Sequence, residues 1–462
     1  MIKLFCQFVV IFVIVWLGTI MNQDGKKATG LRDMPKTFNS EVLTESQLHA
    51  FYYGDTMAIR MGDKWDSPLK NLFEECIVPL SKNAHLLLGH RGCGKSTELC
   101  NLKTKFEADG LPVEIIDYVE NVDVYDTSCW DVMLLITEGL CKIADRKNVP
   151  LSNKTLKAVF DYLTKDVEIT ESTQKMATNT IKADVDVGLP FLKHLLNVFA
   201  AFKNEMMINK ITHTTMSQKM EKRASEWIGY INEISDTIAS KLSGKQPILI
   251  FDNFEKIQPP QKIFDVLEYS ILAGMPFPII YTFPISLNYD ARYVSIKNFY
   301  KPHTLPMIKV CNIDKSENQE GINVIKSIVE LRADFSLFDV DALDLLIKQT
   351  GGVLRDLFNC IITASRRASR RGATKIEHED ALRALLGLSS DLARLISQSD
   401  YHMLANIYND QKYRQKIEDK EFLLNKMQAM VILEYNGRRW HYLHPLIAQF
   451  LEEQGVVKNS SG

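Results

Sequence analysis

The sequence has no C-x-x-C pair and almost no excess of charge of either sign. Its eight cysteines are scattered, which suggests neither a zinc site nor a disulfide framework. The formal net charge of −2 gives no overall attraction to nucleic acid or to acidic membranes, so any basic surface must be local. With 46% hydrophobic and 24% charged residues the composition is that of a globular protein, and 462 residues predict two or three domains.

One glycine-rich segment matches a known phosphate-binding motif. The segment fits G-x-x-x-x-G-K-[S/T] at every fixed position and reads Gly89-His90-Arg91-Gly92-Cys93-Gly94-Lys95-Ser96-Thr97. The apolar run at 85–88 predicts a buried strand before it, and 97–102 predict a helix after it. In such a P-loop, backbone N–H groups surround the β-phosphate, Lys95 reaches the β- and γ-phosphates, and the Ser96 hydroxyl binds Mg²⁺. The segment therefore predicts binding of ATP with Mg²⁺, the alternative being a chance glycine-rich turn.

An acidic motif ends a second apolar run, at 247–251. Asp252 follows directly and is predicted to hold Mg²⁺. Glu255, three positions later, is predicted to orient or deprotonate the attacking water. The alternative is a buried parallel strand whose terminal aspartate only caps a turn.

Apolar runs recur along the first two thirds of the chain, with helical patterns between them. This alternation predicts an α/β domain with a parallel sheet, and the expected strands are 85–89, 112–118, 247–252, 278–283 and 304–309. The interval 120–246 carries several helices. Within it, 188–199 is amphipathic and too short to span a bilayer, so it is either a helix packed on the core or an insertion that faces a partner or a membrane.

The amino-terminal end differs from the rest. Residues 4–21 carry no charge and are just long enough for a tilted membrane helix. The cations that follow, Lys26, Lys27 and Arg32, would place the body of the chain in the cytoplasm, tethered to the inner face of a membrane. The alternative is that Met21 is the true start and the protein is simply cytoplasmic.

Residues 390–455 have the pattern of a separate module. Helical patterns at 391–407 and 420–430 precede a hairpin signal, Asn436-Gly437 between two apolar strands, and a closing helix begins at Pro445. This order predicts a winged helix. The candidate recognition helix, 421–428, is apolar and poor in base-reading donors, so we expect the module to pack on the ATPase or on a partner.

The order of these parts resembles AAA+ and STAND-type ATPases, including the origin-recognition ATPases and KAP-like NTPases, over residues 45–450. The resemblance rests on the P-loop, the helical insertion, the hhhhDxxE strand, a strand ending near Thr282 and the run Gly351-Gly352-Val353-Leu354-Arg355-Asp356. It implies that Thr282 is the sensor 1 residue and that Arg355 is the sensor 2 arginine, which contacts the γ-phosphate from a helical lid. Asp252-Asn253 departs from the Asp-Glu pair common in AAA+ proteins, and the Glu255 spacing fits the STAND pattern better.

Several arginines are further candidates. Arg292 and Arg332 are candidates for an arginine finger or a contact that senses the nucleotide state; the alternative is salt-bridged surface arginines. A cluster spaced by three and four residues would suit the phosphates of a nucleic acid or an acidic partner, the alternative being a solvated helix end. Its members are Arg366, Arg367, Arg370 and Arg371.

The expected fold is an α/β P-loop NTPase with a parallel sheet and a helical lid, followed by a winged-helix domain. The expected parts are a possible anchor at 1–21, a lead at 22–60, the ATPase core at 61–310 with its insertion at 120–246, the lid at 311–389 and the winged helix at 390–455. The leading functional hypothesis is a nucleotide-dependent switch coupled to assembly, with a homo-oligomer or a protein partner. The alternatives are an ATP-regulated DNA-binding protein of the origin-recognition type and a membrane-tethered scaffold.

Overall fold

The computed structural model describes residues 25–39, 41, 43–54, 56–62, 67–78, 83–164, 189–268, 270–435 and 439–458. The predicted anchor at 4–21 and the predicted Asn436-Gly437 turn lie outside them. Among the described residues, none of the helices combines the length and the apolar character needed to cross a bilayer.

The chain forms two compact units. The sheet unit holds Pro68–Gly89 and Glu98–Leu305. The loop unit holds the described residues up to Ser67, then His90–Thr97, and the described residues from Pro306 onward. The glycine loop therefore groups with the amino-terminal lead and the carboxyl-terminal third of the chain rather than with the strand that precedes it in sequence.

The sheet unit is built on five parallel strands in the order β2-β3-β4-β1-β5. Every residue of β1 and β3 is buried, as expected of a parallel sheet covered on both faces. The parallel sheet and four of its strands are thus confirmed. The strands are β1 (Ala84–Gly89), β2 (Val113–Asp117), β3 (Ile248–Asp252), β4 (Ile279–Pro284) and β5 (Lys301–Thr304).

The fifth strand was predicted in the wrong place, because it covers 301–304 rather than 304–309. Leu305 still donates its N–H to Leu88 O at 2.8 Å. Pro306 follows, and it has no N–H with which to continue the ladder. The apolar run beyond it is buried without being part of the sheet.

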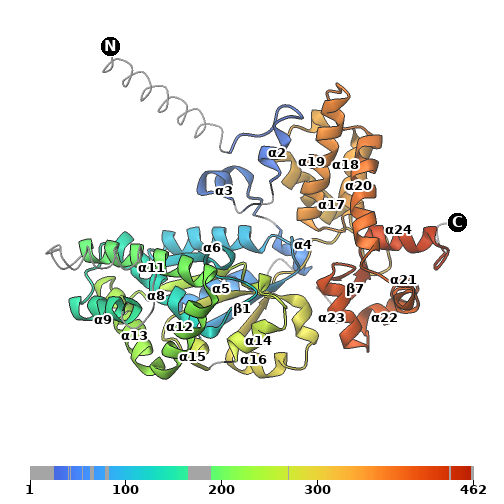
Figure 1. The fold of residues 1–462 in the computed structure, drawn as a ribbon. Helices are drawn as coiled ribbons and strands as arrows, with labels where there is room; N and C mark the ends of the chain where they lie inside the picture. The colour runs from blue at the N-terminus through green and yellow to red at the C-terminus, as the bar shows by residue number, and fades with distance from the viewer. Residues whose placement is uncertain are drawn as a thin grey trace, which may run out of the picture. The chain divides into compact units, whose positions relative to one another are not determined.

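Helices surround the sheet, and α8 is their centre. Helices α11, α12 and α13 contact α8, and α9 packs against α11 and α13; these helices appear as a green group in Figure 1. On α11, Leu192, Leu195, Phe199 and Phe202 are buried, which favours the packed-helix interpretation of 189–199. The helices of this unit are α5 (Pro68–Ile77), α6 (Lys95–Ala108, which begins in the glycine loop), α7 (Tyr118–Asn121), α8 (Cys129–Arg146), α9 (Asn153–Thr164), α11 (Leu189–Ile208), α12 (Lys210–Lys222), α13 (Ala224–Lys241), α14 (Lys262–Leu267), α15 (Ser270–Ala273) and α16 (Tyr293–Phe299).

The loop unit contains a helical bundle, shown in orange in Figure 1, in which α18 and α19 pack against α20. The lead is part of the same bundle, because Phe38, directly after α2, packs edge-on against Phe358 of α19 with ring centroids 5.4 Å apart. The helices of the lead and the bundle are α2 (Met34–Thr37), α3 (Glu45–Phe51), α4 (Met57–Met61), α17 (Gln319–Glu330), α18 (Val340–Gln349), α19 (Leu354–Arg370) and α20 (His378–Ala393).

The end of the chain forms three short helices, an antiparallel ribbon and a closing helix. Helices, hairpin strands and a closing helix follow one another as predicted, with one short helix, α22, more than the two predicted before the hairpin. The winged-helix assignment itself stays a prediction. The module packs against the Gly-Gly turn before α19: Tyr435 donates its hydroxyl to Gly351 O at 2.8 Å. The elements are α21 (Tyr401–Asn409), α22 (Gln411–Gln415), α23 (Lys420–Gln428), β6 (Ile432–Tyr435), β7 (Trp440–Leu443) and α24 (Pro445–Glu453).

Candidate nucleotide site

The glycine loop, His90–Gly94, joins β1 to α6 and has the backbone that its glycines predict. Gly92 has φ +75° and Gly94 has φ +101°, in the left-handed region that side chains with a Cβ rarely adopt. Turns of this kind present successive N–H groups to an anion, and the start of α6 adds the positive end of a helix dipole. The loop is therefore suited to phosphate.

Lys95, the predicted phosphate ligand, is the first residue of α6 and is buried. Its Nζ donates a hydrogen bond to His90 O at 3.1 Å, so the ammonium group bonds to the loop that it belongs to. A phosphate in the loop would offer the ammonium a charged acceptor, which is a stronger partner than a neutral carbonyl.

His90 occupies an unconstrained position of the motif, yet it makes a specific contact. Its Nε2 accepts a hydrogen bond from Glu434 N, on β6, at 2.8 Å. Burial lowers the pKa of His90 to about 4, so the imidazole is neutral and can accept this bond at neutral pH. The contact links the glycine loop to the carboxyl-terminal module, and the motif alone gave no sign of it.

Arg60 of α4 is a second contact that sequence reasoning missed. It is buried and donates to Cys93 O at 2.9 Å and to Pro306 O. Its Nη2 would lie 3.6 Å from a Cβ on Gly94. A buried guanidinium thus fixes the backbone of the glycine loop. A lone arginine in a short helix of the lead belongs to no motif, so the sequence offered no signal for it.

Arg355, the predicted sensor 2 residue, lies against the glycine loop. Its N–H donates to Gly92 O at 3.4 Å. A Cβ on Gly92 would lie only 2.7 Å from Arg355 Cβ and 3.2 Å from Val353 Cγ1, so only glycine permits this approach. The Gly-Gly turn before α19 is equally tight, since a Cβ on Gly352 would lie 2.0 Å from Ile308 O.

In the sheet unit, the predicted acidic and polar residues gather at the carboxyl ends of β3 and β4. Thr282 Oγ1 accepts a hydrogen bond from Phe254 N at 2.9 Å and donates one to Phe251 O at 3.3 Å. Thr282 is therefore bonded to the chain on both sides of Asp252. Glu255 is buried in the short 3₁₀ helix Phe254–Lys256, whose first residue is the one bonded to Thr282.

Helix α6 lies near this acidic end. Burial and the charge of Asp252 together raise the pKa of Cys100, on α6, to about 11. Asn253 has φ +60° and donates its side-chain amide to Asp117 Oδ2, at the end of β2, at 2.6 Å. Asn253 thus has a structural partner at the position where AAA+ proteins commonly have glutamate.

The other predicted arginines have partners of their own. Arg292 pairs with Asp265 and Asp290, each at 3.4 Å, as the salt-bridge alternative expects. Arg332 is buried, donates to Phe51 O at 2.9 Å and to Ile328 O at 3.0 Å, and burial lowers its pKa to about 10. Both arginines thus have partners within the protein, and their roles in sensing a nucleotide stay predictions.

The cluster of four arginines is divided by its contacts. Arg367 and Arg371 both pair with Asp380 of α20, at 3.3 and 2.8 Å. All four arginines are exposed. Since Arg367 and Arg371 are engaged in these ion pairs, Arg366 and Arg370 are the better candidates for a contact with an external phosphate or acidic group.

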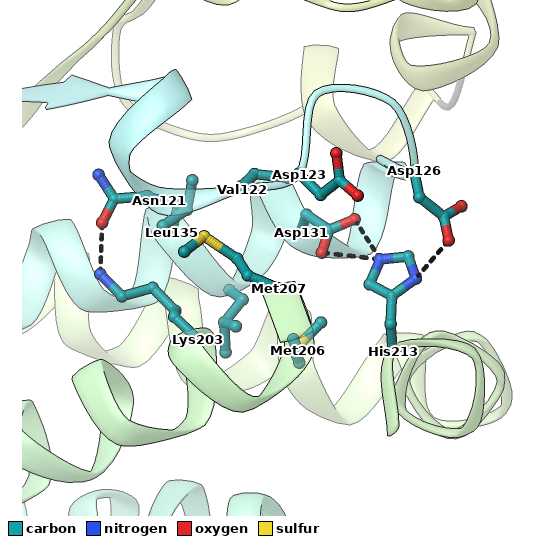
Figure 2. A pocket seen from close by; sticks show the side chains of 11 residues that line it. Asn121, Val122, Asp123, Asp126, Asp131, Leu135, Lys203, Met206, Met207 and His213 are labelled. Carbon is teal, nitrogen blue, oxygen red and sulfur yellow. Dashed lines mark hydrogen bonds and ion pairs between the residues drawn. The ribbon is translucent and has the colours of Figure 1, made fainter. Parts of the chain in front are cut away.

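A separate hollow, shown in Figure 2, lies in the sheet unit among α7, α8, α11 and α12. His213 points between two carboxylates: its Nε2 is 3.1 Å from both Asp131 oxygens, and its Nδ1 is 3.8 Å from Asp126 Oδ2. Lys203 Nζ bonds to Asn121 Oδ1 and to Glu138 Oε2, both at 2.6 Å. No sequence motif marked this pocket.

No protein-family model matches the chain, and no curated protein matches it. Similar solved structures include Cdc6p from Pyrobaculum aerophilum, with 11% identity over 91% of this chain and 98% of that one and a TM-score of 0.34. The ORC2 protein of Aeropyrum pernix has 12% identity over 92% and 97%, with a TM-score of 0.36. The Walker-type ATPase paby2304 of Pyrococcus abyssi has 13% identity over 87% and 99%, with a TM-score of 0.39.

The chain has the fold of a P-loop ATPase. The fold assignment rests on the strand order of the sheet and on the conformation of the glycine loop. The fold alone does not indicate a function, because one fold supports many functions.

His213 gives the fold a specific pH dependence. The hydrogen bond to Asp131 raises the pKa of His213, Asp126 acts in the same direction, and Lys262 and burial oppose them. A histidine whose pKa is higher in the folded state stabilises the folded protein fully below its unfolded pKa of about 6.5, and this contribution disappears as the pH rises through the folded pKa.

His213→Gln should therefore destabilise the protein more at pH 5.5 than at pH 8, as measured by chemical unfolding. His402→Gln, at an exposed position on α21, is the control. Equal destabilisation by His213→Gln at both pH values would contradict the assignment.

Proposed function

We propose that the chain is an ATP- and Mg²⁺-dependent AAA+/STAND-like ATPase that works as a nucleotide-dependent switch. The observation that carries the proposal is the glycine loop, whose phosphate-binding backbone is bonded to Arg355 at the start of α19 and, through His90, to β6. Residues 89–97 would bind the phosphates, with Lys95 as the cation on the β- and γ-phosphates.

The glycine loop and the acidic motif after β3 both supply oxygen atoms, which are the ligands that Mg²⁺ prefers. The roles proposed for the Ser96 hydroxyl and the Asp252 carboxylate are ligation of Mg²⁺, which when bound neutralises charge on the phosphates. Glu255 would take the proton of the attacking water. Thr282 holds the amide of Phe254, so we assign it as the residue that positions the turn carrying Glu255.

Switching follows from the contacts of the loop. ATP differs from ADP by a γ-phosphate, and a ligand shifts an equilibrium only through contacts that differ between the two states. Arg355 already lies against Gly92, so a γ-phosphate would attract its guanidinium, whereas ADP offers less charge. The lid and the carboxyl-terminal module would then report the nucleotide state to a second copy of the chain or to a protein partner.

DNA binding is the second candidate, and the exposed pair Arg366 and Arg370 is the observation in its favour. Contacts between arginine and phosphate make the affinity for DNA depend on the salt concentration. Salt-dependent DNA binding that is lost in Arg366→Glu/Arg370→Glu would support this candidate, and nucleotide-dependent oligomers without DNA affinity would support the switch. A membrane-tethered scaffold depends on residues 4–21, which lie outside the described residues.

Lys95→Ala should weaken ATP binding about 10- to 100-fold, because a charge-assisted hydrogen bond contributes about 1.5–3 kcal/mol. Isothermal titration calorimetry with ATP and Mg²⁺ measures the loss. Lys105→Ala, exposed in the last turn of the same helix, is the matched control and should bind as the wild type does. Unchanged affinity in Lys95→Ala would remove the P-loop assignment.

Glu255→Gln should retain ATP and hydrolyse it about 10²- to 10⁴-fold more slowly, which is the usual contribution of a general base. Phosphate release under single-turnover conditions separates hydrolysis from binding. The control is Glu268→Gln, at an exposed position after α14. A silent Glu255→Gln together with a damaging Asn253→Ala would show that the wrong carboxylate has been chosen.

A further inference from the structure

Two histidines and a glutamate, none of them part of the glycine loop or of the acidic motif, converge at one edge of the sheet. His85 lies on β1 and His303 on the edge strand β5. In the register of these strands His85 is opposite Lys301 and Leu87 is opposite His303, so both histidines point to the same face of the sheet. Helix α5 packs against β5 and brings Glu75 to that face.

The three nearest polar atoms form a small triangle. His85 Nδ1 lies 3.2 Å from His303 Nε2, His303 Nε2 lies 3.2 Å from Glu75 Oε2, and His85 Nδ1 lies 3.8 Å from Glu75 Oε2. Ligand atoms placed about 2.0–2.1 Å from one tetrahedral metal ion are about 3.3–3.4 Å apart. The triangle already has nearly the dimensions of three of the four corners of such a site.

Hydrogen bonding within the protein leaves the cluster incompletely satisfied. Among the described residues His85 Nε2 is buried and makes no hydrogen bond. Glu75 Oε2 is buried as well, and the group that it faces is the His303 imidazole. A buried polar atom without a hydrogen-bond partner is costly. Both imidazoles are buried, and imidazole is the commonest protein ligand for metal ions.

The surrounding contacts hold the donors in this orientation. Lys301 Nζ lies 2.5 Å from Glu75 Oε1, which leaves the other oxygen facing the imidazoles. The His303 ring also makes a hydrogen bond with the backbone of Pro68. Histidines that bind metals commonly donate their second N–H to a carbonyl, and such outer contacts fix the ring and its tautomer.

We propose that Glu75, His85 and His303 form a site for a divalent transition metal ion, with Zn²⁺ as the best match. Two imidazole nitrogens and one carboxylate oxygen suit zinc and its neighbours, whereas Mg²⁺ and Ca²⁺ prefer oxygen alone. The fourth position would hold an exchangeable ligand such as water. A metal here would join α5, β1 and β5, and binding to the folded state alone would stabilise the fold.

The test uses the full chain, freed of metal with a chelator and kept without nucleotide. Calorimetric titration with ZnCl₂ should give one site that is lost in Glu75→Gln and in His303→Asn. Zn²⁺ should raise the melting temperature of the wild type and not that of these two variants. Co²⁺ in place of Zn²⁺ should give the visible absorption of a four-coordinate site in the wild type and not in Glu75→Gln. Exposed His402→Asn is the control for adventitious histidine binding and should behave as the wild type does.

Glu75→Gln keeps the size of the side chain, and circular dichroism would show that it folds, so it carries the test even if His303→Asn does not fold. No stoichiometric Zn²⁺ binding by the wild type would overturn the proposal. Equal Zn²⁺ affinity and equal thermal shift in the wild type and Glu75→Gln would overturn it as well, since the three residues would then be a metal-free polar cluster.

Discussion

The glycine loop His90–Gly94 satisfies its polar groups through distant parts of the chain. Cys93 O accepts from Arg60 in the lead, Gly92 O accepts from the amide of Arg355 in the bundle, and His90 accepts from the amide of Glu434 in the last module. Buried carbonyls and imidazoles need such partners, because an unpaired one costs about 1–3 kcal/mol. The conformation of the loop is thus tied to all of these segments at once.

A phosphate group placed in this loop would have to compete with bonds that already exist. Lys95 would exchange the His90 carbonyl for a charged oxygen, and His90 is itself bonded to β6. Whatever moves His90 or Gly92 also moves the amides bonded to them. The loop is therefore a place where binding chemistry and the positions of other elements are coupled by direct hydrogen bonds, with no long pathway to invoke.

The sequence predicted the local features well because each had a local cause. The glycines of the loop are needed for positive φ, and largely apolar runs marked β1, β3 and β4 because a parallel sheet is buried on both faces. The fifth strand was misplaced because apolar character continues past Pro306, where the ladder ends. Apolar character shows that a segment is buried, and it does not show which buried segments pair.

Contacts between residues far apart in sequence were not predictable. Arg60 is 33 residues from Cys93, and His85 is 218 residues from His303. Neither histidine stands in a spacing that indicates metal binding, and only the pairing of β5 with β1 brings them together. The partner of two arginines of the cluster was not predictable for the same reason: Asp380, which pairs with Arg367 and Arg371, lies on the next helix.

The central claim is that the nucleotide acts on α19 through the glycine loop, and hydrogen exchange across residues 330–385 tests it most directly. The wild type should show more protection with ATP than with ADP in this segment. Arg355→Ala should shrink that difference more than it lowers the affinity for either nucleotide. Equal protection of the wild type in ATP and in ADP would contradict the claim.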